Sequence, residues 1–298
     1  CKNSVMVSKK SNKINQMLKK ELKGKVVLIT GGAGSIGSEI TKKLLDYPVK
    51  AIRVFDIDEH RLFLLKQSIH DSRLRFLLGS ILDKDRLEFA GKGVDLIIHT
   101  AAVKNIEISE FNPIETIDVN INGTVNLIKM AMKNSPKKFL NISTDKAVIP
   151  STLYGTTKQI SERLTAWAGP HLPDTKFATV RFGNVFETRG NVFETWKNEN
   201  ENNKPLSITD PNMKRYFFHT DEAVSFVLDC IPLIDRGETF VPKMKSFKIK
   251  DLANKFSKNH KIIGLRQGEK LDEQLITPDE KKNALEKPNM WIINQYTK

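Results

Sequence analysis

Two pairs of proton-transfer groups lie within one short stretch of the chain, residues 143–158. Tyr154 and Lys158 are four residues apart, so one turn of a helix would place both side chains on the same face. The ammonium group of Lys158 could then lower the pKa of Tyr154, and Tyr154 could take a proton from a substrate hydroxyl. Asp145 and Lys146 add an adjacent acid and base, which could share a proton and shift one another's pKa. The stretch therefore suits a reaction with more than one proton transfer.

A glycine-rich turn near the N-terminus predicts a dinucleotide site. Gly31, Gly34 and Gly37 follow an apolar, β-branched run and precede apolar residues at helical spacing. Such a turn delivers a helix N-terminus whose free N–H groups can hold a pyrophosphate. Asp56 ends the next strand-like run, where a carboxylate can accept both ribose hydroxyls and repel the 2′-phosphate of NADP. The pattern favours NAD over NADP, although nearby Arg61 could soften the repulsion and leaves NADP possible.

The elements that must position these residues alternate between strands and helices. Short apolar runs predict strands, and apolar residues at helical spacing between them predict helices. Alternation of this kind predicts an α/β fold, a Rossmann-type doubly wound parallel sheet with helices on both faces. Strands are expected at 25–30, 51–56, 94–102, 137–143 and 177–185, with helices around 113–133 and 155–168.

Beyond residue 185 this order ends in Asn-rich and Pro-bearing stretches, which favour a smaller C-terminal substrate-binding lobe. The hexapeptide GNVFET occurs twice close together there, and chance or a small duplication explains a single short repeat. We expect a flexible basic leader at 1–23, an NAD(P)-binding Rossmann domain at 24–185 to which 216–241 returns, and a substrate lobe from 186–215 and 243–298.

The net charge of +13 is concentrated at the two ends of the chain. Residues 1–25 carry eight Lys and one Glu, and residues 242–298 carry 13 basic and seven acidic residues, whereas residues 26–241 carry 27 of each sign. The excess does not follow a folded stripe, and no nucleic-acid-binding motif accompanies it. A solvated basic leader is the plain interpretation, and contact with an anionic membrane or partner is the alternative. We expect no nucleic-acid partner.

The remaining composition is ordinary for a globular protein, with 39% hydrophobic and 28% charged residues. No apolar run approaches the length of a transmembrane helix, and the basic N-terminus lacks the apolar segment of a secretory signal. Two cysteines and six scattered histidines offer neither a disulfide framework nor the spacing of a metal site. These features favour a reducing, cytoplasmic compartment.

The motifs of the chain follow one another in a recognisable order. They are TGGAGSIG, HTAAVKN, STDKAV, LYGTTK, VRFGNVFETRG, ITDPNMKRYFF, FVPKMKSFKIKDLA and GLRQGEKLDE. The glycine turn, HTAA, Asn120, STD and the Tyr154–Lys158 pair resemble the extended short-chain dehydrogenase/reductases, which act mainly on nucleotide sugars. The whole series, over residues 24–280, resembles the UDP-N-acetylglucosamine 4,6-dehydratases, including 5-inverting enzymes of pseudaminic-acid and related deoxyamino-sugar biosynthesis. STDKA, FVPKM and GEKL together are far more specific than the fold.

The resemblance implies a reaction that uses both proton-transfer pairs. In this family NAD(P) oxidises C4 of the sugar, water then leaves across C5–C6, and the hydride returns to C6. The resemblance assigns Tyr154 to O4, Lys146 to the C5 proton and Asp145 to the departing C6 hydroxyl, which needs an acid. Lys158 would hold the nicotinamide ribose, and Thr144 would bind or orient the sugar. A surface salt bridge between residues 145 and 146 is the plain alternative.

The resemblance also implies binding residues and a homo-oligomer, at least a dimer, formed by the helices that contain Asn120 and Lys158. Arg215 and Arg266 match positions that hold the UDP diphosphate, a task suited to the guanidinium fork, and Glu269 would hold a uridine ribose hydroxyl. The expected cofactor-binding residues are Gly31, Ala33, Gly34, Ser35, Ile36, Gly37, Asp56, Ser80, Ile81, Ala101, Ala102, Lys104, Asn120, Tyr154 and Lys158. The expected substrate-binding residues are Lys104, Lys146, Asn184, Val185, Arg215, Arg266 and Glu269.

The chain departs from the family pattern at several positions. Ser80 stands where the family usually has an Asp that touches the adenine, so that contact is weaker or replaced. Phe186 and Glu187 stand where relatives usually carry small or apolar residues, which leaves the exact sugar open. Gln267 and Asp272 replace a common Pro and His.

Two other functions are compatible with part of these observations. A nucleotide-sugar 4-epimerase shares the fold, the cofactor and Tyr154, but epimerisation needs no elimination pair such as Asp145 and Lys146. A non-catalytic dinucleotide-binding regulator would be expected to lose Tyr154 or Lys158, and this chain keeps both. The stereochemistry of the product at C5 and the downstream pathway do not follow from the sequence.

Overall fold

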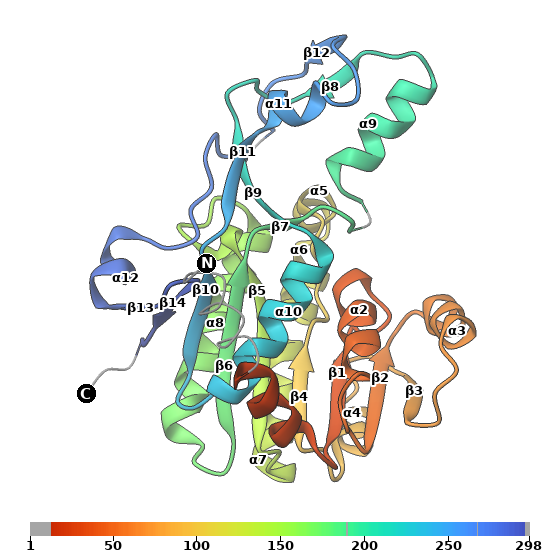
Figure 1. Ribbon diagram of the computed structural model, residues 1–298, viewed down its shortest axis with the longest axis vertical. Coiled ribbons are helices and arrows are strands. Elements are labelled where there is room, and N and C mark those ends of the chain that lie inside the picture. The colour runs from red at the N-terminus through yellow and green to blue at the C-terminus, as the bar shows by residue number, and fades with distance from the viewer. Residues whose placement is uncertain (1–12, 189, 267, 296–298) are drawn as a thin grey trace.

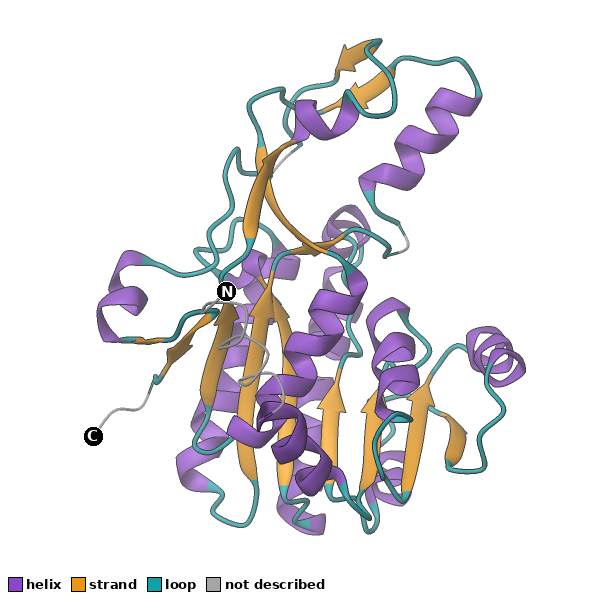
Figure 2. Cartoon of the chain, in the orientation of Figure 1, coloured by secondary structure: helices purple, strands orange, loops and turns teal. Residues whose placement is uncertain are grey.

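The structure is a computed structural model that describes residues 13–188, 190–266 and 268–295. It has a broad sheet covered by helices on both faces, and a smaller lobe beyond the carboxyl ends of the central strands (Figures 1 and 2). Over the described residues the sheet has nine strands, in the order β13 (Leu285–Glu286), β14 (Met290–Ile293), β10 (Glu238–Pro242), β6 (Lys176–Phe182), β5 (Lys138–Thr144), β4 (Leu96–His99), β1 (Val26–Thr30), β2 (Ala51–Asp56) and β3 (Leu74–Leu78).

The strands from β10 to β3 run parallel to their neighbours, whereas β14 pairs antiparallel with both β10 and β13. The order along the chain reverses at β1, because β2 and β3 extend from one side of it and β4, β5 and β6 from the other. In doubly wound sheets, ligands bind outside the carboxyl ends of the strands at this reversal. The predicted Rossmann-type α/β fold is confirmed.

Apolar residues alternate between the two faces of each central strand. In β1, Val27 and Ile29 face one helix layer, whereas Val26 and Leu28 face the other, and all four are buried. Burial on both faces explains the continuous apolar runs VVLIT and LIIH. One layer contains a helix over 13–22, α2 (Ser35–Leu44), α3 (Glu59–Ser68) and α10 (Thr220–Cys230), and the other contains α4 (Lys84–Gly91), α7 (Gly123–Asn134) and α8 (Leu153–His171).

The helix over 13–22 differs from the flexible leader expected at 1–23. Leu18 and Leu22, one helical turn apart, are each 1% exposed and belong to the main core. Glu21 forms an ion pair with Lys138 of β5 at 2.8 Å, and Lys138 also donates to the carbonyl of Ile231. Burial of two leucines and a cross-chain ion pair therefore order this segment. Residues 1–12 of the expected leader lie outside the described residues.

Two short helices, α5 (Ile106–Phe111) and α6 (Pro113–Ile117), follow β4. A π-helical turn, Asp118–Asn122, then joins α6 to α7. The helix expected around 113–133 is therefore present with an internal π turn, a feature that is frequent at functional sites. Asn120 lies in this turn.

The smaller lobe has its own core around Trp196, which is fully buried. Two boundaries differ from the expected ones: β9 crosses the predicted border at 215/216, and β13 and β14 belong to the main sheet because β14 pairs with β10. The lobe contains β7 (Asn184–Val185), β9 (Lys214–Phe218), β11 (Lys245–Lys248), β8 (Leu206–Ile208), β12 (His260–Ile262), α9 (Val192–Glu201) and α11 (Ile249–Ala253), with α12 (Pro278–Asn283) between it and β13.

Candidate active site

The glycine turn between β1 and α2 is too tightly packed for larger side chains. Gly31 has a φ of +67°, and a Cβ on it would lie 2.6 Å from the backbone nitrogen of Ala101. A Cβ on Gly37 would overlap the carbonyl oxygen of Gly31. Gly34 is the N-cap of α2, and no side chain caps this helix end in the described structure. The first N–H groups and the positive end of the helix dipole therefore suit a pyrophosphate.

Asp56 ends β2 beside the glycine turn. Its Oδ2 accepts a hydrogen bond from the N–H of Ala33 at 2.9 Å, and its Oδ1 accepts one from the N–H of Asp58 at 3.1 Å. Each carboxylate oxygen can accept a second hydrogen bond, so Asp56 can hold the turn and still receive ribose hydroxyls. The packed glycines, the helix N-terminus and this carboxylate together fit a dinucleotide.

Several other residues expected to bind the cofactor have local structural contacts. The Ser80 hydroxyl accepts a hydrogen bond from the N–H of Leu82 at 3.1 Å and so stabilises the turn after β3. Ile81 is buried against Gly123 at the start of α7. Ala101 packs against Gly31, and in the first turn of α2 Ser35 and Ile36 are half-buried. These neighbours surround the reversal point of the sheet, and their contacts with a cofactor stay predictions.

Asn120 holds the loop after β4 against α8. Its Nδ2 donates to the carbonyl of Val103 and to Thr157 Oγ1, both at 2.9 Å, and its Oδ1 accepts from the N–H of Val103 at 2.8 Å. The side chain thus binds protein atoms at both ends. Its visible role is to position the loop that carries half-buried Ala102 and exposed Lys104.

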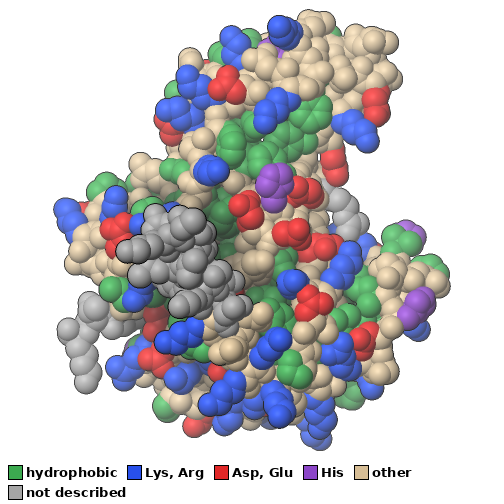
Figure 3. Space-filling model, in the orientation of Figure 1, with side chains coloured by type: hydrophobic (Ala, Val, Ile, Leu, Met, Phe, Trp, Pro, Cys, Tyr) green, Lys and Arg blue, Asp and Glu red, His purple; other side chains and the backbone are tan. Residues whose placement is uncertain are grey.

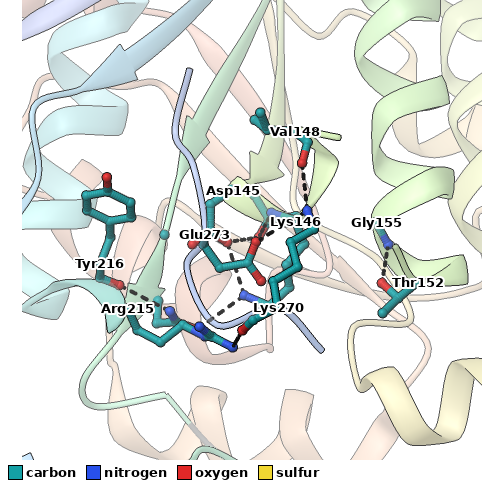
Figure 4. A network of polar contacts seen from close by, with 12 residues as sticks. Asp145, Lys146, Val148, Thr152, Gly155, Arg215, Tyr216, Lys270 and Glu273 are labelled. Carbon is teal, nitrogen blue, oxygen red and sulfur yellow. Dashed lines mark hydrogen bonds and ion pairs between the residues drawn. The ribbon is translucent and has the colours of Figure 1, made fainter. Parts of the chain in front are cut away.

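Asp145 and Lys146 form a 3₁₀ turn, Asp145–Ala147, directly after β5. Asp145 is fully buried, and its Oδ1 accepts hydrogen bonds from Thr144 Oγ1 and Lys146 Nζ, each at 3.0 Å (Figure 4). Lys146 Nζ also donates to Asn184 Oδ1 at 3.4 Å. Asp145 Oδ2 is buried without a hydrogen-bond partner in the described structure. One oxygen of this acid is therefore held by neighbours, and the other is available for proton transfer.

Tyr154 and Lys158 lie in the first turns of α8, which Thr152 caps by accepting a hydrogen bond from the N–H of Gly155. Burial raises the pKa of Tyr154, the charge of Asp145 raises it further, and a hydrogen bond with Thr144 lowers it. Burial also lowers the pKa of Lys158 to about 8, against the opposing effect of Glu162.

These pKa shifts differ from one sequence expectation. Lys158 was expected to lower the pKa of Tyr154, but burial and Asp145 raise it well above its ordinary value. Both effects depend on tertiary structure, which the four-residue spacing cannot reveal. The charge of Asp145 shifts the pKa of Tyr154, so the two proton-transfer pairs influence each other.

His99 is a buried neighbour of this site whose sequence context gives no sign of a role there. Its Nδ1 shares a hydrogen bond with Thr30 Oγ1 at 2.7 Å, and its Nε2 shares one with Thr124 Oγ1 at 3.2 Å. Burial, together with the charge of Lys158, lowers the pKa of His99 to about 3. The imidazole is therefore neutral at physiological pH and ties β1, β4 and α7 together beneath the candidate site.

The lobe supplies the other predicted substrate residues. Asn184 contacts Lys146 and donates through Nδ2 to the carbonyl of Tyr216 at 3.1 Å, whereas Val185 is buried in the core. The guanidinium of Arg215 is buried and binds backbone carbonyls: Nη1 donates to Lys214 and Leu271, and Nη2 donates to Lys270. Arg215 thus joins β9 to the segment after residue 265, and its contact with a diphosphate stays a prediction.

Arg266 and Glu269 lie in that segment. Arg266 is exposed, its N–H donates to Glu269 Oε2 at 2.9 Å, and its carbonyl accepts from the N–H of Glu269 at 3.0 Å. The two residues therefore close one turn, which leaves the guanidinium of Arg266 at the surface. Their ligands stay predictions.

Two charged residues near the catalytic turn were missed in the sequence. Lys270 Nζ donates to the carbonyl of Val148 at 2.9 Å and lies 3.6 Å from Glu273 Oε2 (Figure 4). The carboxylate of Glu273 is buried. The motif GEKL contains Lys270, but its spacing gives no sign of a contact 122 residues away.

A cavity of about 450 Å³ lies between the N-termini of α2 and α10. Glu187, one of the departures from the family pattern, accepts hydrogen bonds there from His219 Nδ1 and from the N–H of Thr220. Figure 3 shows acidic side chains gathered in the hollow below the lobe, under an apolar patch. The cavity is lined by Ser35, Ser38, Glu39, Glu187, His219, Thr220 and Asp221, so it adjoins the glycine turn and not the two proton-transfer pairs.

Residues 27–295 match the family model described as "Polysaccharide biosynthesis protein". The chain belongs to this family. No helix in the described ranges is long and apolar enough to span a bilayer.

Among individual relatives, the chain is 39% identical over 277 residues to a UDP-N-acetylglucosamine 4,6-dehydratase (inverting) of Campylobacter jejuni, covering 91% of this chain and 83% of the relative. It is 34% identical over 281 residues to a UDP-glucose 4-epimerase of Rickettsia bellii, covering 90% and 82%.

Among solved structures, Pen from Bacillus thuringiensis superposes with a TM-score of 0.87 at 36% identity, covering 91% of this chain and 88% of that one. The dTDP-glucose 4,6-dehydratase DesIV from Streptomyces venezuelae, solved with NAD and TYD bound, superposes with a TM-score of 0.77 at 20% identity, covering 86% and 90%. At that identity the second likeness concerns the fold alone.

Proposed function

We propose that this protein is a nucleotide-sugar-modifying enzyme that removes water from UDP-N-acetylglucosamine across C5 and C6. The observation that carries the proposal is the contact of buried Asp145 with half-buried Lys146, at 3.0 Å, near Tyr154, whose pKa Asp145 raises. An oxidoreductase that only moves a hydride has no use for a second acid and base, whereas an elimination needs both. The C. jejuni relative, named as an inverting dehydratase of this substrate, supports the same reading.

The proposed steps divide between the two pairs. Tyr154, in its deprotonated phenolate form, takes the proton from O4 as C4 is oxidised, and Lys158 holds the nicotinamide ribose. With their shared proton on Asp145, the neutral amine of Lys146 then takes the C5 proton, which the new C4 carbonyl has made acidic, and the protonated Asp145 gives its proton to the C6 hydroxyl, which leaves as water. Thr144, which contacts both Asp145 and Tyr154, keeps these groups aligned.

We infer that the cofactor is NAD, which supplies the chemistry of accepting a hydride from C4 and returning it to C6. The packed glycine turn and the carboxylate of Asp56 support this choice. Titration of the protein with each dinucleotide tests it, and we expect tighter binding of NAD than of NADP. An NADP affinity equal to or better than that for NAD would contradict the assignment.

A second candidate function is 4-epimerisation, which the Rickettsia relative named as a UDP-glucose 4-epimerase favours. Incubation with UDP-N-acetylglucosamine and measurement of the product mass separates the two. A dehydratase gives a product lighter by one water, an epimerase gives an isobaric product, and a non-catalytic regulator gives none. The expected oligomer, at least a dimer, stays a prediction.

A further inference from the structure

The loop between the two proton-transfer pairs, residues 148–152, has an unfavourable backbone. Ile149 has a φ of +46°, although a β-branched residue rarely adopts the left-handed region. Its side chain is 60% exposed, so burial of the side chain does not compensate for this conformation. Contacts from elsewhere must therefore hold the loop.

Two such contacts come from the distant segment 268–270. Lys270 Nζ donates to the carbonyl of Val148 at 2.9 Å, and Ser151 Oγ donates to the carbonyl of Gly268 at 2.5 Å. Val148 is also the residue that closes the catalytic turn, because its N–H donates to the carbonyl of Asp145 at 3.1 Å. Val148 thus connects Lys270 on one side with Asp145 on the other.

Lys270 is itself fixed by its neighbours (Figure 4). Its carbonyl accepts a hydrogen bond from Arg215 Nη2 at 2.8 Å, which ties its backbone to β9. Its ammonium lies 3.6 Å from Glu273 Oε2, which is buried without a hydrogen-bond partner in the described structure. A buried carboxylate is costly unless a cation is near, so Glu273 favours a position of Lys270 close to the catalytic turn.

We propose that Lys270 is a positioning residue for the elimination step. Through Val148 it sets the place of the turn that carries Asp145 and Lys146, and Glu273 keeps its ammonium in reach of Val148. This inference rests on the proposed function, since it assigns Asp145 and Lys146 to the loss of water. It goes further in joining the segment expected to bind the nucleotide to the acid and base that act on the sugar.

The test uses Lys270→Met in the full chain, with NAD and UDP-N-acetylglucosamine. Loss of the Val148 contact should lower kcat for dehydration by about 10–100-fold, the scale expected for a small misplacement of reacting groups. C4 oxidation should continue at a near wild-type rate, so reduced cofactor accumulates. Lys270→Arg should restore most of kcat, because a guanidinium can also donate to the Val148 carbonyl.

The matched control is Lys282→Met. Lys282 forms an ion pair of the same i,i+3 type with Asp279 at 3.0 Å, but both side chains are largely exposed on α12. We expect its kinetics to be unchanged. Should Lys270→Met not fold, Glu273→Gln keeps the side-chain shape and should cause a smaller loss in the same step.

The outcomes separate this inference from the proposed function. A wild-type chain that dehydrates the sugar, beside a Lys270→Met variant with unchanged kcat, overturns the positioning role alone. A parallel loss of C4 oxidation and dehydration also overturns it, because a general structural role would impair both steps. Absence of water loss in the wild-type chain overturns the proposed function and this inference with it.

Discussion

The two ends of the stretch 143–158 each carry a pair of proton-transfer groups, but the two pairs lie on different kinds of secondary structure. Tyr154 and Lys158 lie on a 19-residue helix, where Lys158 is buried and Tyr154 is half-buried. Asp145 and Lys146 lie on a three-residue 3₁₀ turn that connects β5 to a strained loop. The first pair is positioned by regular secondary structure. In the second pair, Lys146 contacts Asn184, and the neighbouring Val148 accepts a hydrogen bond from Lys270.

This difference suggests how one fold can acquire different reactions. The Tyr–Lys pair, the glycine turn and Asp56 belong to the sheet and its helices, which suit oxidation and reduction. The Asp–Lys turn is added at the end of β5, and its placement depends on residues that also border the expected sugar-nucleotide site. We therefore expect changes in the lobe to alter the loss of water and to leave C4 oxidation intact.

The largest predicted effect follows from removing one member of the Tyr154–Lys158 pair on α8. Tyr154→Phe removes the hydroxyl that we propose acts at O4, so both C4 oxidation and dehydration should fall by about 10²–10⁴-fold, the range for a positioned proton-transfer group. Stopped-flow absorbance of the nicotinamide band and product mass measure the two steps. Substantial reduced cofactor in this variant would contradict the role of Tyr154.

A smaller effect is expected on UDP binding by Arg266, a residue of the lobe. Arg266→Ala should weaken UDP binding by about 1.5–3 kcal/mol, the usual scale of a charged hydrogen bond, without changing the fold. Isothermal titration calorimetry with UDP measures it, and Lys258→Ala, an exposed basic residue of the same lobe, is the control. Unchanged affinity would remove Arg266 from the site.

The smallest predicted effect is a gain in the free energy of unfolding when Lys158 of α8 is replaced. The pKa of Lys158 is about 8 in the folded chain and near 10.5 when unfolded, so the unfolded state holds more protons between these values. Stability therefore rises with pH across this window, and the full penalty applies below pH 8. Lys158→Met should raise the free energy of unfolding at pH 7 by about 1–3 kcal/mol while abolishing activity.

Chemical denaturation at pH 7 and pH 10 checks this prediction, because the gain should shrink at the higher pH. Exposed Lys129→Met on α7 serves as the control and should show no such pH dependence. A Lys158→Met variant that is less stable than the wild type at pH 7 would contradict the prediction that burial of the charged Lys158 lowers the free energy of unfolding.

The features of the site that the sequence could predict depend on local spacing. The glycine turn, Asp56 and the Tyr154–Lys158 pair each lie within or beside one element, so periodicity and motif position located those elements. The same logic was available for Leu18 and Leu22, whose four-residue spacing marks a buried helix face, but the surrounding lysines led to a flexible leader instead.

The parts that sequence could not predict depend on long-range contacts. The residues of β14 were predicted to lie in the lobe, but they belong to the main sheet because β14 pairs with β10. The raised pKa of Tyr154 follows from burial and from Asp145, and the link from Lys270 to Val148 spans 122 residues. Arg215 has a side chain suited to a diphosphate, yet the structure directs it to backbone carbonyls.

The most direct test of the division of labour is the reaction of Lys146→Met with NAD and UDP-N-acetylglucosamine. Without the base for the C5 proton, dehydration should fall by about 10²–10⁴-fold while C4 oxidation proceeds. We expect absorbance at the nicotinamide band to rise and persist, with little product lighter by one water. Dehydration by Lys146→Met at a near wild-type rate would contradict the assignment of the two pairs to separate steps.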